Sequence, residues 1–325
     1  MRFGVLGTAA IATSSVIPAI RSSEHGMTAI ASRDQGRAET VAAEFGIPEA
    51  YGSYEELLSE AEVDGVYVPL PNGLHAEWIR NAADAGLHVL CEKPLTGSAV
   101  ETAAVFEYCE DRGVILLEAF MYRFHPRTER ALEIVGSHLG DVTSIASTCT
   151  YPVPRGSADV RLDPSLAGGS LFDVGCYGVD VVRSMLGLPD RVYARSVDAR
   201  GVGVDSRLTA LLAYDSGATA TVTAGFDSPD AQCYRVQTTD GWLDAERAFW
   251  VDPTERVELA YGVNDRAEVE RFDPVDDYRL EVEHFARCVE TGVSPRIGRA
   301  ESLGTARIVD ALYRSAAEGR PVDLE

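Results

Sequence analysis

Apolar runs and amphipathic segments alternate through the first third of the chain. The apolar runs, each of strand length, cover residues 2–6, 27–31, 63–70, 87–90 and 114–118. Between them the apolar positions follow the period of a helix, and residues that cap helix N-termini, such as Asp34 and Ser53, stand where the helices begin. Buried strands that alternate with helices predict an α/β unit with a doubly wound parallel sheet.

The second half of the chain is rich in β-forming runs separated by turn signals such as Asp215-Ser216-Gly217. These runs predict strands over residues 141–151, 192–197, 208–214, 219–226 and 234–238. Strands joined by short turns run antiparallel, so we expect an α+β domain with an open, mostly antiparallel sheet. We place the domain boundary between residues 121 and 122, giving domains 1–121 and 122–325. The last helix, about 299–318, is expected to pack back on the first domain.

The charge balance excludes some classes of partner. Acidic residues outnumber basic ones by 51 to 29 and the net charge is −22, so nucleic acids and anionic membranes would be repelled. An acidic chain with a single lysine indicates adaptation to high salt, where self-repulsion is screened. The six cysteines form no Cys-x-x-Cys pair, so no metal site is predicted. We see neither a signal peptide nor a membrane-spanning run, and expect a cytoplasmic protein.

The turn after the first strand has the position and composition of a dinucleotide-binding turn. The strand at residues 2–6 runs into a glycine and several small residues, and a helical pattern follows at once. Ala9 and Ala12 replace the second and third glycines of the usual fingerprint, but both are small enough to let a pyrophosphate approach the helix N-terminus. The residues predicted to bind the cofactor here are Gly7, Thr8, Ala9, Ala10 and Ile11.

The residues after the second strand determine which nicotinamide cofactor fits. A carboxylate there would bind the ribose of NAD, whereas basic side chains accommodate the 2′-phosphate of NADP. Ser32, Arg33 and Arg37 provide a hydroxyl and two guanidinium groups, so we favour NADP over NAD. Asp34 could serve NAD instead, although its position as a helix N-cap would occupy its carboxylate. Arg33 could also be a solvated surface charge.

The only lysine of the chain, Lys93, stands directly after the strand at residues 87–90. Strand ends of an open α/β sheet face the ligand crevice, so we favour a functional lysine over one on a surface loop. The ends of this strand and of the preceding one supply further expected cofactor contacts: Pro69, Asn72, His75 and Glu92. His75 is expected in the cofactor pocket and not as the catalytic base, since a lone histidine is more often structural.

Asp173 and Tyr177 follow a glycine-rich approach, Gly168-Gly169, and begin a helix that ends near residue 186. Four residues apart, they share one helical face and could form an acid–base pair. The alternative is an N-terminal aspartate favoured by the helix dipole and a tyrosine packed in the core.

Four segments together resemble the Gfo/Idh/MocA oxidoreductases, in the branch of dihydrodiol dehydrogenases and NADP-dependent sugar oxidoreductases. They are residues 7–12, 92–94, 118–126 and 168–177. The resemblance implies a Rossmann domain, then a domain whose open sheet forms the subunit interface, a nicotinamide cofactor and a sugar, polyol or diol substrate. It also implies that Lys93 belongs to the catalytic region, that Tyr177 is the acid/base and that Asp173 lines the substrate site.

These expectations combine into an NADP-dependent oxidoreductase that transfers hydride between a sugar or cyclic diol hydroxyl, such as C1 of a xylose-like aldose, and the nicotinamide. The phenol of tyrosine has a pKa of about 10 and becomes a usable base only when a neighbouring ammonium lowers that pKa, which is the role expected of Lys93 toward Tyr177. The alternatives are a non-catalytic dinucleotide sensor and a tight-NADP sugar–sugar oxidoreductase. An open sheet face that needs a cover predicts a homodimer or homotetramer.

Overall fold

The computed structural model describes the chain except for residues 157–158, 265 and 325. The chain divides into two compact units. The first unit comprises residues 1–121 and 276–303, and the second comprises residues 122–275 and 304–325. No helix within the described ranges is long and apolar enough to cross a membrane.

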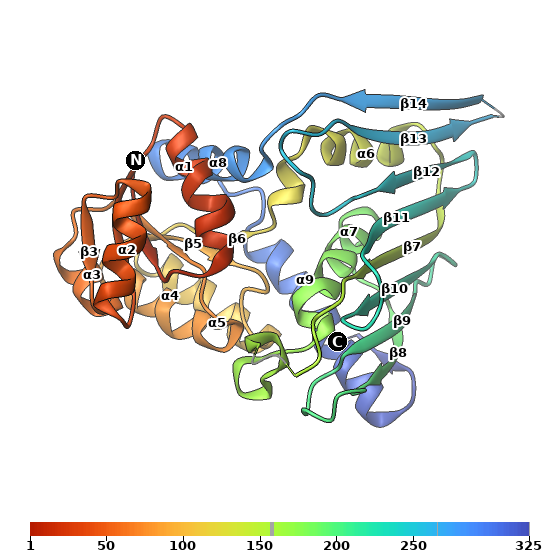
Figure 1. Cartoon of the computed structure of the whole chain (residues 1–325). Coiled ribbons are helices and arrows are strands. Elements are labelled where there is room, and N and C mark those ends of the chain that lie inside the picture. The colour runs from red at the N-terminus through yellow and green to blue at the C-terminus, as the bar shows by residue number, and fades with distance from the viewer. Residues whose placement is uncertain (157–158, 265, 325) are drawn as a thin grey trace. The chain divides into compact units, whose positions relative to one another are not determined.

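A six-stranded sheet forms the centre of the first unit (Figure 1). All of its pairings are parallel, and the strand order is β3-β2-β1-β4-β5-β6. The strands are β1 (Arg2–Leu6), β2 (Gly26–Ala31), β3 (Glu49–Tyr51), β4 (Gly65–Val68), β5 (His88–Glu92) and β6 (Leu116–Ala119). The middle strands are buried along almost their whole length because helices cover the sheet, as expected for a doubly wound parallel sheet.

Helices connect these strands and begin at the caps that the sequence predicts. Asp34 caps α2 (Gln35–Phe45) and Ser53 caps α3 (Tyr54–Glu60). The other helical segments are η1 (Ala12–Val16), α1 (Ile17–Ser22), η2 (Asn72–Leu74), α4 (His75–Asp84) and α5 (Ala99–Glu110). From the distant end of the chain, α8 (Asp277–Thr291) returns to lie against α1 (Figure 1).

A nine-stranded sheet forms the second unit, in the order β14-β13-β12-β11-β7-β10-β9-β8-β15. Its described pairings are antiparallel except that of β7 with β10, which is parallel. The strands are β7 (Val142–Thr150), β8 (Arg191–Val197), β9 (Arg207–Ala213), β10 (Thr219–Gly225), β11 (Ala231–Thr238), β12 (Gly241–Glu246), β13 (Val257–Val263), β14 (Arg266–Phe272) and β15 (Val322–Asp323). The fold class predicted from the sequence is confirmed for both units.

Helices cover one face of this sheet and leave the other face open (Figure 1). The helix α7 (Cys176–Leu186) packs on β7 and β10, and α6 (Pro126–Ser137) packs on β13. The remaining helical segments are η3 (Met121–Phe124), η4 (Val160–Leu162), η5 (Pro164–Leu166), η6 (Leu171–Gly175) and α9 (Arg299–Glu318). The helix α9 begins in the first unit and ends in the second.

Candidate cofactor and catalytic sites

The turn after β1 has the geometry that a pyrophosphate requires. Gly7 has a φ of +128°, and a Cβ there would lie 3.2 Å from Cδ2 of Leu70, so the turn needs glycine. The amide of Ala12 donates to the Ala9 carbonyl at 3.0 Å and begins the helix. Thr8, Ala9, Ala10 and Ile11, which keep exposed surface, therefore stand at a helix N-terminus whose amides can bind an anion.

The segment after β2 presents cationic and hydroxyl groups. The carboxylate of Asp34 accepts the amide of Arg37 at 3.1 Å, so its capping role occupies it, and the NAD alternative loses support. Arg33 and Arg37 are exposed, and the Arg37 guanidinium donates to the Thr8 carbonyl at 3.3 Å. The hydroxyl of Ser32, a buried residue, accepts the amide of Asp34 at 3.2 Å. This segment therefore suits a 2′-phosphate, which could form charge-assisted hydrogen bonds with the two guanidinium groups.

Tyr54 is a neighbour of this segment that the sequence analysis did not single out. Burial raises the pKa of its phenol, and a hydrogen bond from Arg33 opposes that shift. The hydroxyl also lies 3.9 Å from where a Cβ on Gly7 would stand, and the ring packs edge-on against Trp78, with 4.8 Å between centroids. As the first residue of a helix opened by a capping box, Tyr54 carries no local signal that would reveal these contacts.

The residues predicted at the ends of β4 differ in their surroundings. Pro69 is buried, and Asn72 opens η2 with part of its surface exposed. His75 is 0% exposed, and its two ring nitrogens lie 3.0 Å and 2.7 Å from the carbonyls of Pro94 and Leu70. Burial lowers the pKa of His75. Its side chain therefore joins the loops that follow β4 and β5.

Glu92 is the last residue of β5, Lys93 follows it, and both are half-buried. The carboxylate of Glu92 accepts the Tyr67 hydroxyl at 2.6 Å and the backbone amide of Lys93 at 3.3 Å. These bonds fix the side chain of Glu92 and the backbone at Lys93. Lys93 belongs to the first unit, whereas Asp173 and Tyr177 belong to the second.

The second unit places Asp173 in η6 and Tyr177 in the first turn of α7. The carboxylate of Asp173 accepts the Tyr151 hydroxyl at 2.6 Å and forms an ion pair of 3.3 Å with Arg161. Arg161 lies in η4. Tyr177 is 8% exposed, and its ring stacks on Phe249 with 5.4 Å between centroids.

A buried ionic network lies one helical turn beyond Tyr177. Asp180, 1% exposed, accepts the Tyr122 hydroxyl at 2.6 Å and pairs with Arg123 at 2.9 Å and Arg183 at 3.1 Å. Burial alone would raise the pKa of Asp180, but the two guanidinium groups hold it below its usual value. Because the ring of Tyr122 also packs edge-on against Tyr177, at 5.8 Å between centroids, this network fixes a side chain in direct contact with the Tyr177 ring.

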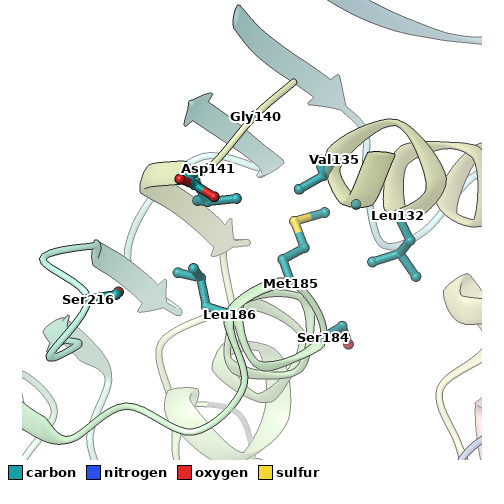
Figure 2. Close-up of a pocket in the computed structure, with 10 residues that line it drawn as sticks. Leu132, Val135, Gly140, Asp141, Ser184, Met185, Leu186 and Ser216 are labelled. Atoms are coloured by element: carbon teal, nitrogen blue, oxygen red, sulfur yellow. The ribbon is translucent and has the colours of Figure 1, made fainter. Parts of the chain in front are cut away.

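A cavity of about 550 Å³ opens at the other end of α7 (Figure 2). Its lining comes from α6, the start of β7 and the last turn of α7, and includes Leu132, Val135, Asp141, Met185 and Leu186. None of the predicted site residues lines it. Among the described residues, no three His, Cys, Asp or Glu side chains are grouped so as to hold a metal ion.

The fold and these groups define a dinucleotide-dependent oxidoreductase. The chain belongs to the GFO/IDH/MocA oxidoreductase family: residues 1–120 match the model of its NAD-binding Rossmann fold, and residues 129–244 match that of its C-terminal domain. This confirms the family that the sequence motifs predict.

Curated and solved relatives extend this result. A D-xylose 1-dehydrogenase (NADP(+)) of Haloferax volcanii is 61% identical over 325 residues, covering 100% of both chains. A 3-ketoreductase from Actinomadura kijaniata, solved in complex with NADP and TDP-benzene, is 34% identical with a TM-score of 0.91 and 97% of both chains covered. Variants of this reductase, one with tyrosine changed to phenylalanine and one with lysine changed to alanine, match with TM-scores of 0.91 and 0.88, identities of 33% and 32% and the same coverage.

An aldose-aldose oxidoreductase from Caulobacter crescentus, complexed with glycerol, has a TM-score of 0.91 and 28% identity. It covers 100% of this chain and 99% of its own.

Proposed function

We propose that this protein is an NADP-dependent dehydrogenase that oxidises the C1 hydroxyl of an aldose, with D-xylose as its substrate. The observation that carries the proposal is the 61% identity, over the full length of both chains, with the D-xylose dehydrogenase of Haloferax volcanii. Identity at that level spans both the dinucleotide-binding unit and the unit that carries Tyr177, so it applies to cofactor and substrate alike.

The first unit would hold the cofactor. The turn at Gly7 and the amides that follow would bind the pyrophosphate, and Ser32, Arg33 and Arg37 would bind the 2′-phosphate. Glu92 and Asn72 would contact the nicotinamide half. Bound NADP supplies the hydride acceptor.

The second unit would supply the proton acceptor. As the C1–H bond breaks and its electron pair leaves with the hydride, the hydroxyl proton passes to Tyr177 and the C1–O bond becomes the carbonyl of a lactone. Lys93 would favour the phenolate by its positive charge and donate a hydrogen bond to the substrate oxygen. Asp173 is held by Tyr151 and Arg161, and its carboxylate would orient the sugar by accepting a hydrogen bond from one of its hydroxyls.

The variants of the 3-ketoreductase support the choice of these two residues. The lysine and tyrosine replaced in that protein are separated by the same number of residues as Lys93 and Tyr177. Substitutions at that spacing in a relative of the same fold are consistent with a shared pair of reacting groups.

A sugar–sugar oxidoreductase is the second candidate, because the aldose-aldose oxidoreductase matches the whole chain. Such an enzyme keeps its NADP bound between two half-reactions, whereas a dehydrogenase releases it. A non-catalytic sensor would bind NADP without turnover.

The open face of the nine-stranded sheet is the surface we propose for self-association into a homodimer or homotetramer. One cross-strand row on it runs through Tyr193, Leu211, Thr221, Ala146 and Arg235. Leu211 is 44% exposed, and the row continues through the β-branched Thr221 and the small Ala146, where a second copy could approach closely. Light scattering after gel filtration in molar KCl would test this. A need for free NADP makes the cytoplasm the proposed location.

The decisive experiment is NADP reduction followed by absorbance in molar KCl, with D-xylose, other aldoses, cyclic diols and NAD as comparisons. Turnover with D-xylose and NADP well above the rest supports the proposal. Turnover only when a second sugar is present as acceptor favours the sugar–sugar enzyme, and NADP binding without turnover favours the sensor.

A further inference from the structure

A buried aspartate outside the predicted site lies at the start of the helix that carries Tyr177. Asp205 stands in the loop between β8 and β9, two residues before β9, and is 7% exposed. Its Oδ2 accepts the Ser170 hydroxyl at 2.6 Å and the amide of Leu171 at 2.9 Å. Its backbone carbonyl accepts the amide of Ser170 at 2.8 Å. A distant loop therefore performs the capping that no side chain of the helix itself provides.

The other oxygen of the same carboxylate binds the C-terminal helix. Tyr313 of α9 donates its hydroxyl to Oδ1 of Asp205 at 2.8 Å, and its ring packs on that of Phe172, with 5.0 Å between centroids. Phe172 belongs to η6, directly before Asp173. Tyr313 and Asp205 thus hold the same short segment from two sides.

The backbone of this segment is shaped to fit the carboxylate. Gly169 has a φ of +128°, and a Cβ there would lie 2.3 Å from Oδ1 of Asp205 and 2.9 Å from the hydroxyl of Tyr313. The carbonyl of Gly169 then accepts the amide of Asp173 at 3.0 Å. Gly169 therefore lies against Asp205 on one side and is hydrogen-bonded to the backbone of Asp173, so one backbone hydrogen bond links the position of Asp205 to that of Asp173.

We infer that Asp205 and Tyr313 form a latch that positions Asp173 and Tyr177 for the reaction. Asp205 is a positioning residue, since it acts through the helix start and touches no reacting atom. The inference rests on the proposed function for Asp173 and Tyr177. A latch is needed here because η6 begins without a side-chain cap of its own, and a free helix start frays. A shift of about 1 Å at a reacting group can cost about 100-fold in rate.

The carboxylate is required because both of its oxygens are used. An amide has only one acceptor oxygen, so Asp205→Asn must give up either the Tyr313 bond or the bonds from Ser170 and Leu171. Tyr313→Phe removes one donor and leaves the ring contact with Phe172. The matched control is Ser315→Ala, also on α9. Its buried hydroxyl bonds to Ala194 and Arg320 and not to the helix start.

The test measures kcat and KM for D-xylose, the Kd for NADP and the melting temperature of each variant. We expect Asp205→Asn to lower kcat about 10-fold or more and Tyr313→Phe about fivefold, with the Kd for NADP unchanged. Ser315→Ala should lower the melting temperature and leave kcat unchanged. A folded Asp205→Asn enzyme with wild-type kcat overturns the latch. If that variant does not fold, Tyr313→Phe decides in the same way.

Hydrogen exchange separates failure of the latch from failure of the proposed function. In both latch variants, and not in Ser315→Ala, the amides of Leu171 and Asp173 should exchange faster than in the wild type. Unchanged exchange overturns the latch whatever the enzyme turns over. Faster exchange in a protein that oxidises no aldose keeps the latch and rejects the dehydrogenase.

Discussion

The guanidinium of Arg37 reaches from α2 to the turn after β1 and donates a hydrogen bond of 3.3 Å to the carbonyl of Thr8. One guanidinium nitrogen of Arg37 is therefore used to hold the turn. Arg33 has more of its guanidinium available to bind an anion. Arg33 is exposed, and its side chain is hydrogen-bonded to the Tyr54 hydroxyl. In the proposed complex with NADP, the two arginines would therefore have different roles toward the 2′-phosphate.

Arg33→Ala should weaken NADP binding while leaving NAD binding unchanged. Loss of one charge-assisted bond to a phosphate costs about 1.5–3 kcal/mol, which raises the Kd for NADP about 10- to 100-fold. Fluorescence titration of both cofactors measures this. Arg80→Ala, which removes a cation from α4 beside Tyr108, is the control and should change neither Kd. An equal loss for NADP and NAD would mean that Arg33 does not contact the 2′-phosphate.

Tyr177→Phe should lower kcat about 100- to 10,000-fold, the usual contribution of a general base, with the Kd for NADP unchanged. Lys93→Arg should also lose turnover, because a planar guanidinium cannot take the place of a compact ammonium. Tyr214→Phe is the matched control. Tyr214 is a buried tyrosine of the same unit, whose hydroxyl bonds only weakly, at 3.4 Å, to the Gly187 carbonyl. Near-wild-type turnover by Tyr177→Phe would exclude it as the proton acceptor.

Asp180→Asn should destabilise the protein at neutral pH by about 3–5 kcal/mol, because it leaves two buried guanidinium groups without their counter-charge. The pKa of Asp180 is depressed in the folded state, so its contribution is present above its unfolded pKa of about 3.9 and is lost as the pH falls through the lower folded pKa. The difference between the two proteins should therefore shrink below about pH 4.

Urea unfolding at pH 7 and at pH 3 measures this difference. Asp84→Asn, which removes an exposed ion pair with Arg112, is the control and should have little effect at either pH. A difference that stays constant between the two pH values would show that Asp180 is not ionised in the folded protein.

Thermal stability should rise with KCl from dilute buffer to molar concentration. With 51 acidic and 29 basic residues, self-repulsion at low ionic strength opposes the compact state, and the Debye length falls from about 10 Å at 0.1 M to about 3 Å at 1 M. Melting curves at fixed pH across a KCl series test this. A melting temperature that is highest in dilute buffer would reject adaptation to high salt.

Sequence patterns predicted the strands of the first unit well where they are buried on both faces. They missed β3, because three partly exposed residues, Glu49–Tyr51, form an edge strand too short to show a period. They also predict one helix near residues 128–137, whereas α6 begins two residues earlier. Pro126 occupies its first position, and the ring of His125 caps it by accepting the amide of Arg127 at 3.0 Å.

The proposed site residues could be named from the sequence because local signals mark them: a turn after β1, a lone lysine after β5 and a glycine-rich helix start. Asp205, Tyr313 and Tyr54 were not accessible. Each is a single polar residue whose importance arises from a contact over a long separation in sequence, 34 residues in the case of Leu171 and Asp205. No local pattern, such as a hydrophobic period or a helix cap, indicates such a contact in the sequence, so only the three-dimensional fold reveals it.

The position of the only lysine, at the end of β5, makes this chain a simple substrate for amine chemistry. An N-hydroxysuccinimide ester reacts with amines, and the sequence has one side-chain amine, that of Lys93, besides the α-amine of the N-terminus. A dye or resin that couples to amines will therefore react either at the N-terminus or at Lys93, which belongs to the proposed reaction centre. Coupling at low pH, where the α-amine reacts first, would immobilise the protein by one end and spare Lys93.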